Sequence, residues 1–166
     1  MPRLTHLASR FAGSLWPGGP PAADDAWATR HLGRGEVLLW RRMKGFDRRH
    51  AVGVARRVSA ALGSQATAPV MAAALLHDVG KVDSNFGVFG RVVATIRAAA
   101  MGAEKAAAGS GRMARYTHHP SIGARLLQDA GADPLTVAWA AQHHLPPTQW
   151  TLPEHVAAAL KDADDD

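Results

Sequence analysis

The chain is organised around one apolar run that ends in charged side chains, Val70-Met71-Ala72-Ala73-Ala74-Leu75-Leu76-His77-Asp78-Val79-Gly80-Lys81. The run predicts a helix buried on most sides, with Pro69 in its first turn. At the end of such a helix, burial of the ionised carboxylate of Asp78 beside His77 is energetically costly unless a counter-charge or a metal ion stabilises it. Gly80 fits a helix C-terminal cap, and Lys81 fits a cation beside a helix end. The rest of the chain is therefore expected to supply further ligands.

Length and composition indicate one globular domain. The 166 residues can bury a sizeable core, and alanine-rich runs with few β-branched or aromatic stretches favour an all-α fold. The absence of cysteine excludes disulfides, thiolate metal ligands and thiol nucleophiles, and it fits a cytoplasmic protein. No stretch has the pattern of a membrane span or of a secretory signal.

The net charge of +5 conceals a strongly basic body. Four of the 14 acidic residues stand at the end of the chain, so residues 1–161 carry 19 basic against 10 acidic side chains. Such a surplus suits a small phosphorylated partner. No basic stretch is interleaved with aromatic residues, so no nucleic-acid polymer is expected as a partner. The sequence assigns no oligomeric state.

Proline, glycine and capping residues divide the chain into segments. Residues 1–30 are expected to form an N-terminal extension with a Pro/Gly linker at 16–21, and residues 31–166 to form the domain itself. Helices are predicted over 36–44, 47–62, 68–78, 92–100, 120–130 and 134–144, and from 153 into the acidic end. Asp47 is expected to cap the second of these helices, and Asp133 with Pro134 to open the sixth. The pattern predicts no strand.

Six of the nine histidines fall near helix ends, as do Asp78 and the terminal aspartates. These histidines are His50, His77, His118, His119, His143 and His144, whereas His6, His31 and His155 stand outside the set. All-α proteins build metal pockets where residues on several helices converge in the bundle. Nitrogen and oxygen ligands without sulfur suit iron, manganese, zinc or nickel. Each residue alone also fits a structural or solvated role, so the interpretation depends on the joint pattern.

The order of these residues closely resembles the HD-domain metal-dependent phosphohydrolase superfamily over roughly residues 47–165. The resemblance is carried by His77-Asp78-Val79-Gly80-Lys81 after an apolar helix, by an upstream His50, by His119-Pro120-Ser121-Ile122-Gly123-Ala124-Arg125-Leu126-Leu127, by the pair His143-His144, and by a terminal Ala163-Asp164. The chain is similar to a compact bacterial HD domain of the His-Asp-x-Gly-Lys type with a binuclear ligand set. This resemblance implies an all-α helical bundle with its metal site at converging helix ends.

The resemblance also implies a role for each ligand. One metal would be held by His50, His77, Asp78 and Asp164, and the second by His119, His143 and His144, with Asp78 as the bridge. Two divalent transition metals are expected, with iron or manganese favoured and zinc, nickel or magnesium also compatible. Asp78 and Lys81 would be catalytic, Lys81 by neutralising a phosphate oxygen in the transition state. His118 is expected outside the ligand set, and Asp162 or Asp165 is the alternative to Asp164.

Departures from known HD subfamilies narrow the function. The chain lacks the Gly-Tyr-Pro signature of the HD-GYP module, the Glu-Asp pair of guanosine alarmone hydrolases and the pattern of dNTP triphosphohydrolases. It is similar instead to the catalytic domain of membrane HD hydrolases that cleave cyclic di-AMP, without their membrane helices. This similarity implies a phosphodiesterase acting on a nucleotide or a cyclic dinucleotide, whose phosphates would meet Lys81, Arg91, Arg112 and Arg115. Two alternatives stay open, a mixed-valent di-iron oxygenase and a nucleotide-binding regulatory HD protein without turnover.

Overall fold

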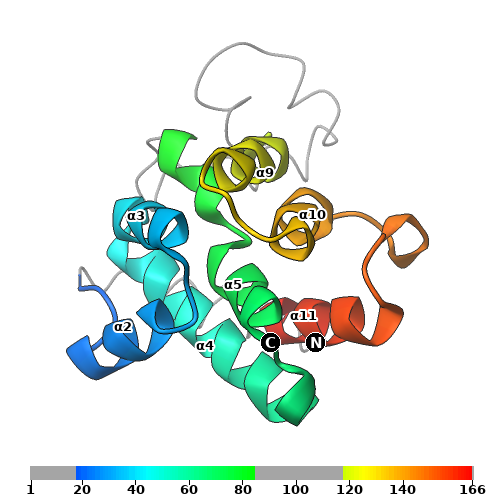
Figure 1. Ribbon diagram of the computed structural model, residues 1–166, viewed down its shortest axis with the longest axis horizontal. Helices are drawn as coiled ribbons and strands as arrows, with labels where there is room; N and C mark the ends of the chain where they lie inside the picture. The colour runs from blue at the N-terminus through cyan, green and yellow to red at the C-terminus, as the bar shows by residue number, and fades with distance from the viewer. Residues whose placement is uncertain (1–17, 85–117, 166) are drawn as a thin grey trace, which may run out of the picture.

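The computed structural model describes residues 18–84 and 118–165, and all regular structure in these two ranges is helical (Figure 1). The all-α prediction is therefore confirmed. The α-helices are α2 (Ala22–Thr29), α3 (Arg34–Arg42), α4 (Gly45–Leu62), α5 (Ala68–Leu76), α9 (His119–Asp129), α10 (Pro134–Gln142) and α11 (Glu154–Asp165). Three short 3-10 turns connect them, η1 (Gly63–Gln65), η2 (Val79–Ser84) and η3 (Pro147–Gln149).

Helix α5 lies at the centre of the bundle (Figure 1). All of its residues from Val70 to Leu76 are buried, as the uninterrupted apolar sequence predicts. It contacts α3, α4, α10 and α11, and the same core contains Trp40, Trp139 and Leu160 from three of these helices. Because α5 is enclosed on several sides, the core itself determines where the residues after its last turn lie.

Local capping signals predict most helix starts. Asp133 Oδ1 accepts a hydrogen bond of 2.8 Å from the amide of Leu135, and Pro134 opens α10, as expected. The N-cap assignment of Asp47 is wrong, because α4 begins two residues earlier and Asp47 lies buried inside its first turn. The start at Gly45 is packed closely on the preceding chain, since a Cβ atom there would lie 2.8 Å from the carbonyl oxygen of Gly18.

Gly80 allows α9 to approach the turn after α5. A Cβ atom at this position would lie 1.9 Å from the carbonyl oxygen of His119 and 2.6 Å from the amide nitrogen of Gly123, closer than real Cβ atoms come. The expected C-cap role is therefore wrong: α5 ends at Leu76, and Gly80 lies inside η2 without a positive φ. The glycine is needed for close packing of two backbones.

Helix α2 packs against α4, although it falls inside the segment predicted as an extension. Asp25 Oδ1 accepts hydrogen bonds of 2.9 Å from the indole nitrogen of Trp40 and 2.9 Å from the guanidinium of Arg48. On the same side, Arg56 stacks 3.7 Å above the ring of Trp27. These contacts bind residues 22–29 to the bundle, and a division of the chain near residue 30 stays a prediction.

Several predictions fall on parts of the chain that the structure does not describe. These are the first 17 residues of the predicted N-terminal extension, the helix over 92–100, and the phosphate-binding roles of Arg91, Arg112 and Arg115. Across 18–84 and 118–165, no helix combines the length and the apolar character needed to cross a bilayer.

Candidate metal centre

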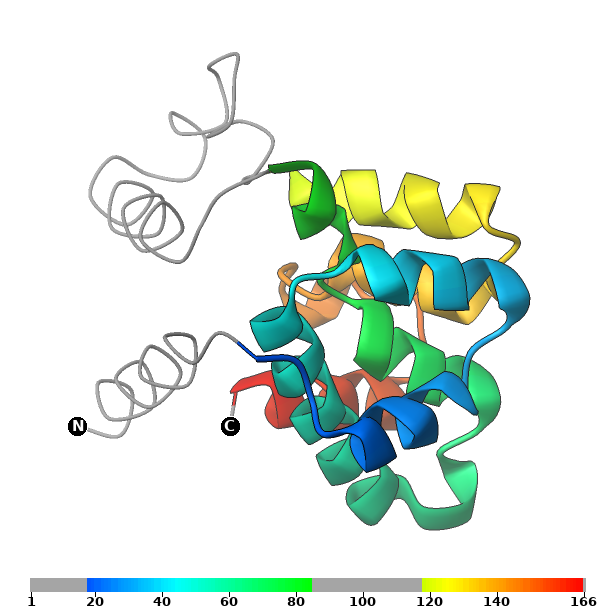
Figure 2. The ribbon, with the colours of Figure 1, turned by 90° about the vertical axis from the view of Figure 1, so that its left-hand side faces the viewer.

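The predicted ligands lie at the ends of helices that meet on one side of the bundle. Helix α4 carries His50 in its first half, the turn after α5 carries His77 and Asp78, and the other ligands come from the first residue of α9, the end of α10 and the last turn of α11. Figure 2 shows the beginning of α9 and the end of α11 on the same side of the molecule. Residues far apart in the sequence are thereby brought into one cluster.

One group of ligand atoms forms around Asp164. Its Oδ1 atom lies 2.9 Å from Nε2 of His50 and 3.4 Å from Nε2 of His77. The same Nε2 atom of His77 lies 3.5 Å from Oδ2 of Asp78. Ligand atoms of His50, His77 and Asp78 all lie within 4.8 Å of one another, which is compatible with a shared metal ion.

A second group consists of three histidines from α9 and the end of α10. Ligand atoms of His119, His143 and His144 lie within 4.8 Å of one another, and the Nε2 atoms of His119 and His143 are 3.4 Å apart. Asp78 stands between the two groups. Its Oδ1 atom lies 3.3 Å from His119 and 3.7 Å from His143, whereas its Oδ2 atom faces His77 and Lys81.

Backbone hydrogen bonds orient two of the buried imidazoles. Nδ1 of His77 donates to the carbonyl of Ala74 at 3.0 Å, and Nδ1 of His143 donates to the carbonyl of Ala140 at 2.9 Å. These hydrogen bonds turn the Nε2 atom of each ring into the cluster. Nε2 of His77 is buried and makes no hydrogen bond within the described residues. A buried ring nitrogen beside two carboxylates fits a metal ligand, which binds once the ring has released its proton.

Electrostatics at the group around Asp164 favour a bound cation. Burial lowers the pKa of His77, but the carboxylates of Asp78 and Asp164 outweigh this effect and raise it to about 9. Burial raises the pKa of Asp78, yet Lys81 and His77 hold it well below its usual range. The pKa of Asp164 is lowered in the same way, against its burial, by the charge of His77 and by the hydrogen bond with His50. Both carboxylates are therefore ionised, and positive charge beside them is stabilised.

Two of the three histidines in the second group, His143 and His144, are neutral at physiological pH. Burial is the largest cause that lowers the pKa of His143, to about 2, and repulsion from His77 and His144 adds to it. The pKa of His144 is lowered to about 4 by burial and by repulsion from His119, even though its outer edge reaches solvent. Metal binding requires neutral imidazole, so the rings of His143 and His144 need no deprotonation before they act as ligands.

Lys81 contacts the site directly. Its Nζ atom forms an ion pair with Oδ2 of Asp78, and its backbone amide donates to the carbonyl of Asp78 at 3.0 Å. The side chain is 14% exposed, so the ammonium group lies at the edge of the cluster. This position allows Lys81 to contact a molecule bound there.

The remaining candidates lie outside the cluster. Asp162 is exposed, Asp165 pairs with Lys161 at 2.6 Å, and His118 is exposed before α9. Asp164 is thus the terminal aspartate that meets the histidines. The sequence analysis did not assign a role to Gly123, whose backbone packs against the turn at Gly80. A glycine in the first turns of a predicted helix was the signal that could have indicated this close contact.

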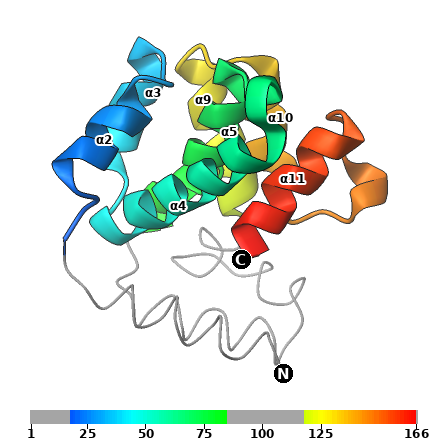
Figure 3. The ribbon, with the colours of Figure 1, turned by 90° about the horizontal axis from the view of Figure 1, so that it is seen from below.

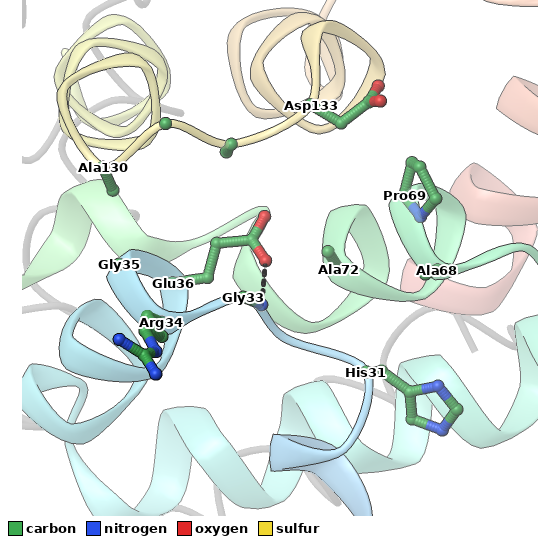
Figure 4. A pocket seen from close by; sticks show the side chains of 12 residues that line it. His31, Gly33, Arg34, Gly35, Glu36, Ala68, Pro69, Ala72, Ala130 and Asp133 are labelled. Carbon is green, nitrogen blue, oxygen red and sulfur yellow. Dashed lines mark hydrogen bonds between the residues drawn. The ribbon is translucent and has the colours of Figure 1, made fainter.

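A cavity of about 390 Å³ lies away from this cluster, and Figure 4 shows it closely. Its lining comes from the segments 31–36, 68–72 and 130–133. The last two segments belong to the start of α5 and to the connection from α9 to α10, whereas the clustered histidines lie at the other ends of these helices. Within it, the carboxylate of Glu36 accepts a hydrogen bond of 2.7 Å from the amide of Gly33. None of the predicted ligands lines this cavity, so its size does not mark the reactive site.

Comparison with known proteins agrees with this geometry. The family model described as "Cas3, HD domain" matches residues 36–164. No similar protein was found among curated proteins or among solved structures. The matched range includes all the helices that carry the clustered histidines and aspartates. Since the match covers most of its length, the chain belongs to the Cas3 HD-domain family, and with it to the HD superfamily of metal-dependent hydrolases.

Proposed function

We propose that this HD domain is a metal-dependent phosphodiesterase that acts on a nucleotide or a cyclic dinucleotide through a binuclear site. The observation that carries the proposal is the position of Asp78. Its two carboxylate oxygens face different ligand groups, Oδ1 towards His119 and His143 and Oδ2 towards His77. A carboxylate between two sets of donors is the arrangement expected of a bridging ligand.

The donor set supports two divalent transition metals. One would be held by His50, His77, Asp78 and Asp164, and the other by His119, His143, His144 and the second oxygen of Asp78. Iron or manganese is favoured by donors that are only nitrogen and oxygen, and zinc, nickel and magnesium are also compatible. When bound, such metal ions polarise phosphoryl oxygens and lower the pKa of water.

The chain itself supplies orientation and charge. Backbone hydrogen bonds to the Nδ1 atoms of His77 and His143 hold these rings in a fixed tautomer. Lys81, at the edge of the cluster, is proposed to bind a non-bridging phosphate oxygen and to stabilise the charge that develops there in the transition state. Arg91, Arg112 and Arg115, outside the described residues, stay candidates for further phosphate contacts.

A second candidate substrate is a nucleic-acid strand. HD domains of the Cas3 type are nucleases, and the chain matches that family over residues 36–164. The bond that is cleaved, a phosphodiester, would be the same. A small nucleotide remains our first proposal, because the sequence lacks the interleaved basic and aromatic residues of strand-binding proteins.

The decisive experiment is hydrolysis of a defined substrate panel by the full-length protein loaded with manganese or iron. The panel contains cyclic di-AMP, cyclic di-GMP, linear dinucleotides and single-stranded DNA and RNA oligonucleotides, with products identified by mass spectrometry. Asp78→Ala is the inactive control, and His155→Ala is the matched control because His155 lies outside the cluster.

Each result has a defined meaning. Cleavage of a dinucleotide that is lost in Asp78→Ala and kept in His155→Ala supports the first proposal. Cleavage of oligonucleotides alone would identify a nuclease instead. An oxygen-dependent product would favour a di-iron oxygenase, and tight nucleotide binding without turnover would favour a regulatory protein.

A further inference from the structure

Arg57 holds the end of the helix that carries Asp164. Its Nε and Nη2 atoms donate hydrogen bonds of 3.0 and 2.7 Å to the carbonyl oxygen of Ala163, which is 106 positions away in the sequence. Ala163 is 4% exposed and immediately precedes Asp164. We infer that Arg57 is a positioning residue that fixes Asp164 for metal binding, an inference that rests on the metal site proposed above.

The carbonyl of Ala163 needs an external donor. It belongs to the last turn of α11, where carbonyl groups have no amide partner within the helix. A cation at a helix C-terminus is also stabilised by the helix dipole. The planar guanidinium of Arg57 donates two N–H groups to this one oxygen, which restrains both its position and its direction. A single ammonium group would restrain it less.

Helix α4 therefore holds α11 at two neighbouring points. His50 and Arg57 are seven residues apart, or about two helical turns, and so lie on the same face of α4. His50 contacts the side chain of Asp164 at 2.9 Å, and Arg57 binds the backbone just before it. Figure 3 shows α11 beside α4, in agreement with their contacts.

The surroundings of Arg57 consist mostly of small side chains. A cavity of about 650 Å³ between α4 and α11 is lined by Arg57, Leu62, His155, Asp162 and five alanines. On α4, a Cβ atom at Gly53 would lie 3.5 Å from Nη1 of Arg57, an ordinary contact, so the guanidinium passes close to this position. The two N–H groups of the guanidinium add a directional restraint to the packing of these small side chains.

Loss of the restraint should weaken metal binding without abolishing it. The oxygen of Asp164 lies 2.9 Å from His50 and 3.4 Å from His77, and a small displacement of the last turn of α11 would separate these donors. Partners that orient metal ligands typically contribute 10–100-fold in affinity. Because Arg57 acts through one backbone carbonyl, the expected loss is at the lower end, about 10-fold.

The test is a titration of the full-length protein with Mn²⁺, in which the EPR signal of free Mn²⁺ reports affinity and the number of sites. Arg57→Ala should weaken one class of site about 10-fold, and Arg57→Lys should give a smaller loss. Arg56→Ala is the matched control, since Arg56 is the next residue on α4 but pairs with Asp24 at 3.0 Å. It should bind Mn²⁺ like the unmodified protein. Circular dichroism of the metal-free variants monitors the fold.

The Asp164→Ala variant distinguishes a failure of the proposed metal site from a failure of the proposed role of Arg57. If it lowers Mn²⁺ affinity while Arg57→Ala and Arg57→Lys bind normally, the metal site stands and the role of Arg57 is wrong. If Asp164→Ala also binds normally, the proposed ligand set fails, and the inference fails with it. In the double variant, Arg57→Ala should add nothing to Asp164→Ala; an additive loss would mean that Arg57 does not act through Asp164.

Discussion

Replacing Gly80 by alanine tests how closely the two halves of the metal site must approach. A Cβ atom at this position would lie 1.9 Å from the carbonyl oxygen of His119, and contacts below 3.0 Å are not found for real Cβ atoms. The first turn of α9 would therefore have to retreat by about 1 Å. The amide of Gly123, 2.6 Å from the same atom, belongs to the same helix, so no side-chain rotation relieves the overlap.

Two consequences are expected from this displacement. Overpacking of this kind typically lowers the free energy of unfolding by about 1–3 kcal/mol. Because the displaced carbonyl belongs to His119 itself, the imidazole moves away from Oδ1 of Asp78, which lies 3.3 Å away in the native protein. A ligand displaced by about 1 Å should hold its metal ion less tightly, so the metal content per chain after loading should fall.

The assays are urea unfolding of the metal-free protein and metal content per chain after loading. Gly53→Ala is the matched control, since its new Cβ atom would meet only Nη1 of Arg57 at 3.5 Å, an ordinary contact. Inside α4, this alanine should be neutral or stabilising by up to about 1 kcal/mol. If Gly80→Ala unfolds like the unmodified protein and binds the same amount of metal, the close approach is not required and the reasoning is refuted.

Four further variants test the site and the bundle separately. Asp78→Ala should remove both metals, whereas His144→Ala should chiefly empty the site formed by the three histidines. Metal content is measured by elemental analysis, and full metal content in Asp78→Ala would disprove the bridging role of Asp78. Asp25→Ala leaves the indole nitrogen of Trp40 without its partner and should lower the free energy of unfolding by about 1–3 kcal/mol; an unchanged urea midpoint would mean that α2 adds little to the domain. Trp139→Ala removes a side chain that is 1% exposed and should cost about 3–5 kcal/mol, measured in the same way, and a cost below 1 kcal/mol would contradict its place in the core.

Helix-forming signals in the sequence are local, and they predicted most of the fold. The apolar run over 70–76 and the Asp133-Pro134 pair lie where their patterns predict, because burial on all sides and N-terminal capping depend on a few neighbouring residues. The start of α4 was predicted two residues late. There the decisive contact is between Gly45 and the distant backbone of Gly18, which no local pattern contains.

The order of the candidate ligands was also evident from the sequence, through its resemblance to HD domains. The choice among Asp162, Asp164 and Asp165 was not, because three aspartates in one helical turn have the same chemistry. Only the packing of α11 against α4 and α5 turns Asp164 towards His50 and His77 and leaves the other two exposed.

The sequence by itself determined the all-α class, the approximate position of most helices in the described ranges and the chemical nature of the donors. Tertiary structure alone decided that Asp164 meets His50 and His77, why Gly80 must lack a side chain, and that Arg57 reaches the carbonyl of Ala163. The physical reason is distance along the chain. Periodicity and capping act within one or two turns, whereas these contacts join residues that are remote in sequence and meet only after the helices have packed.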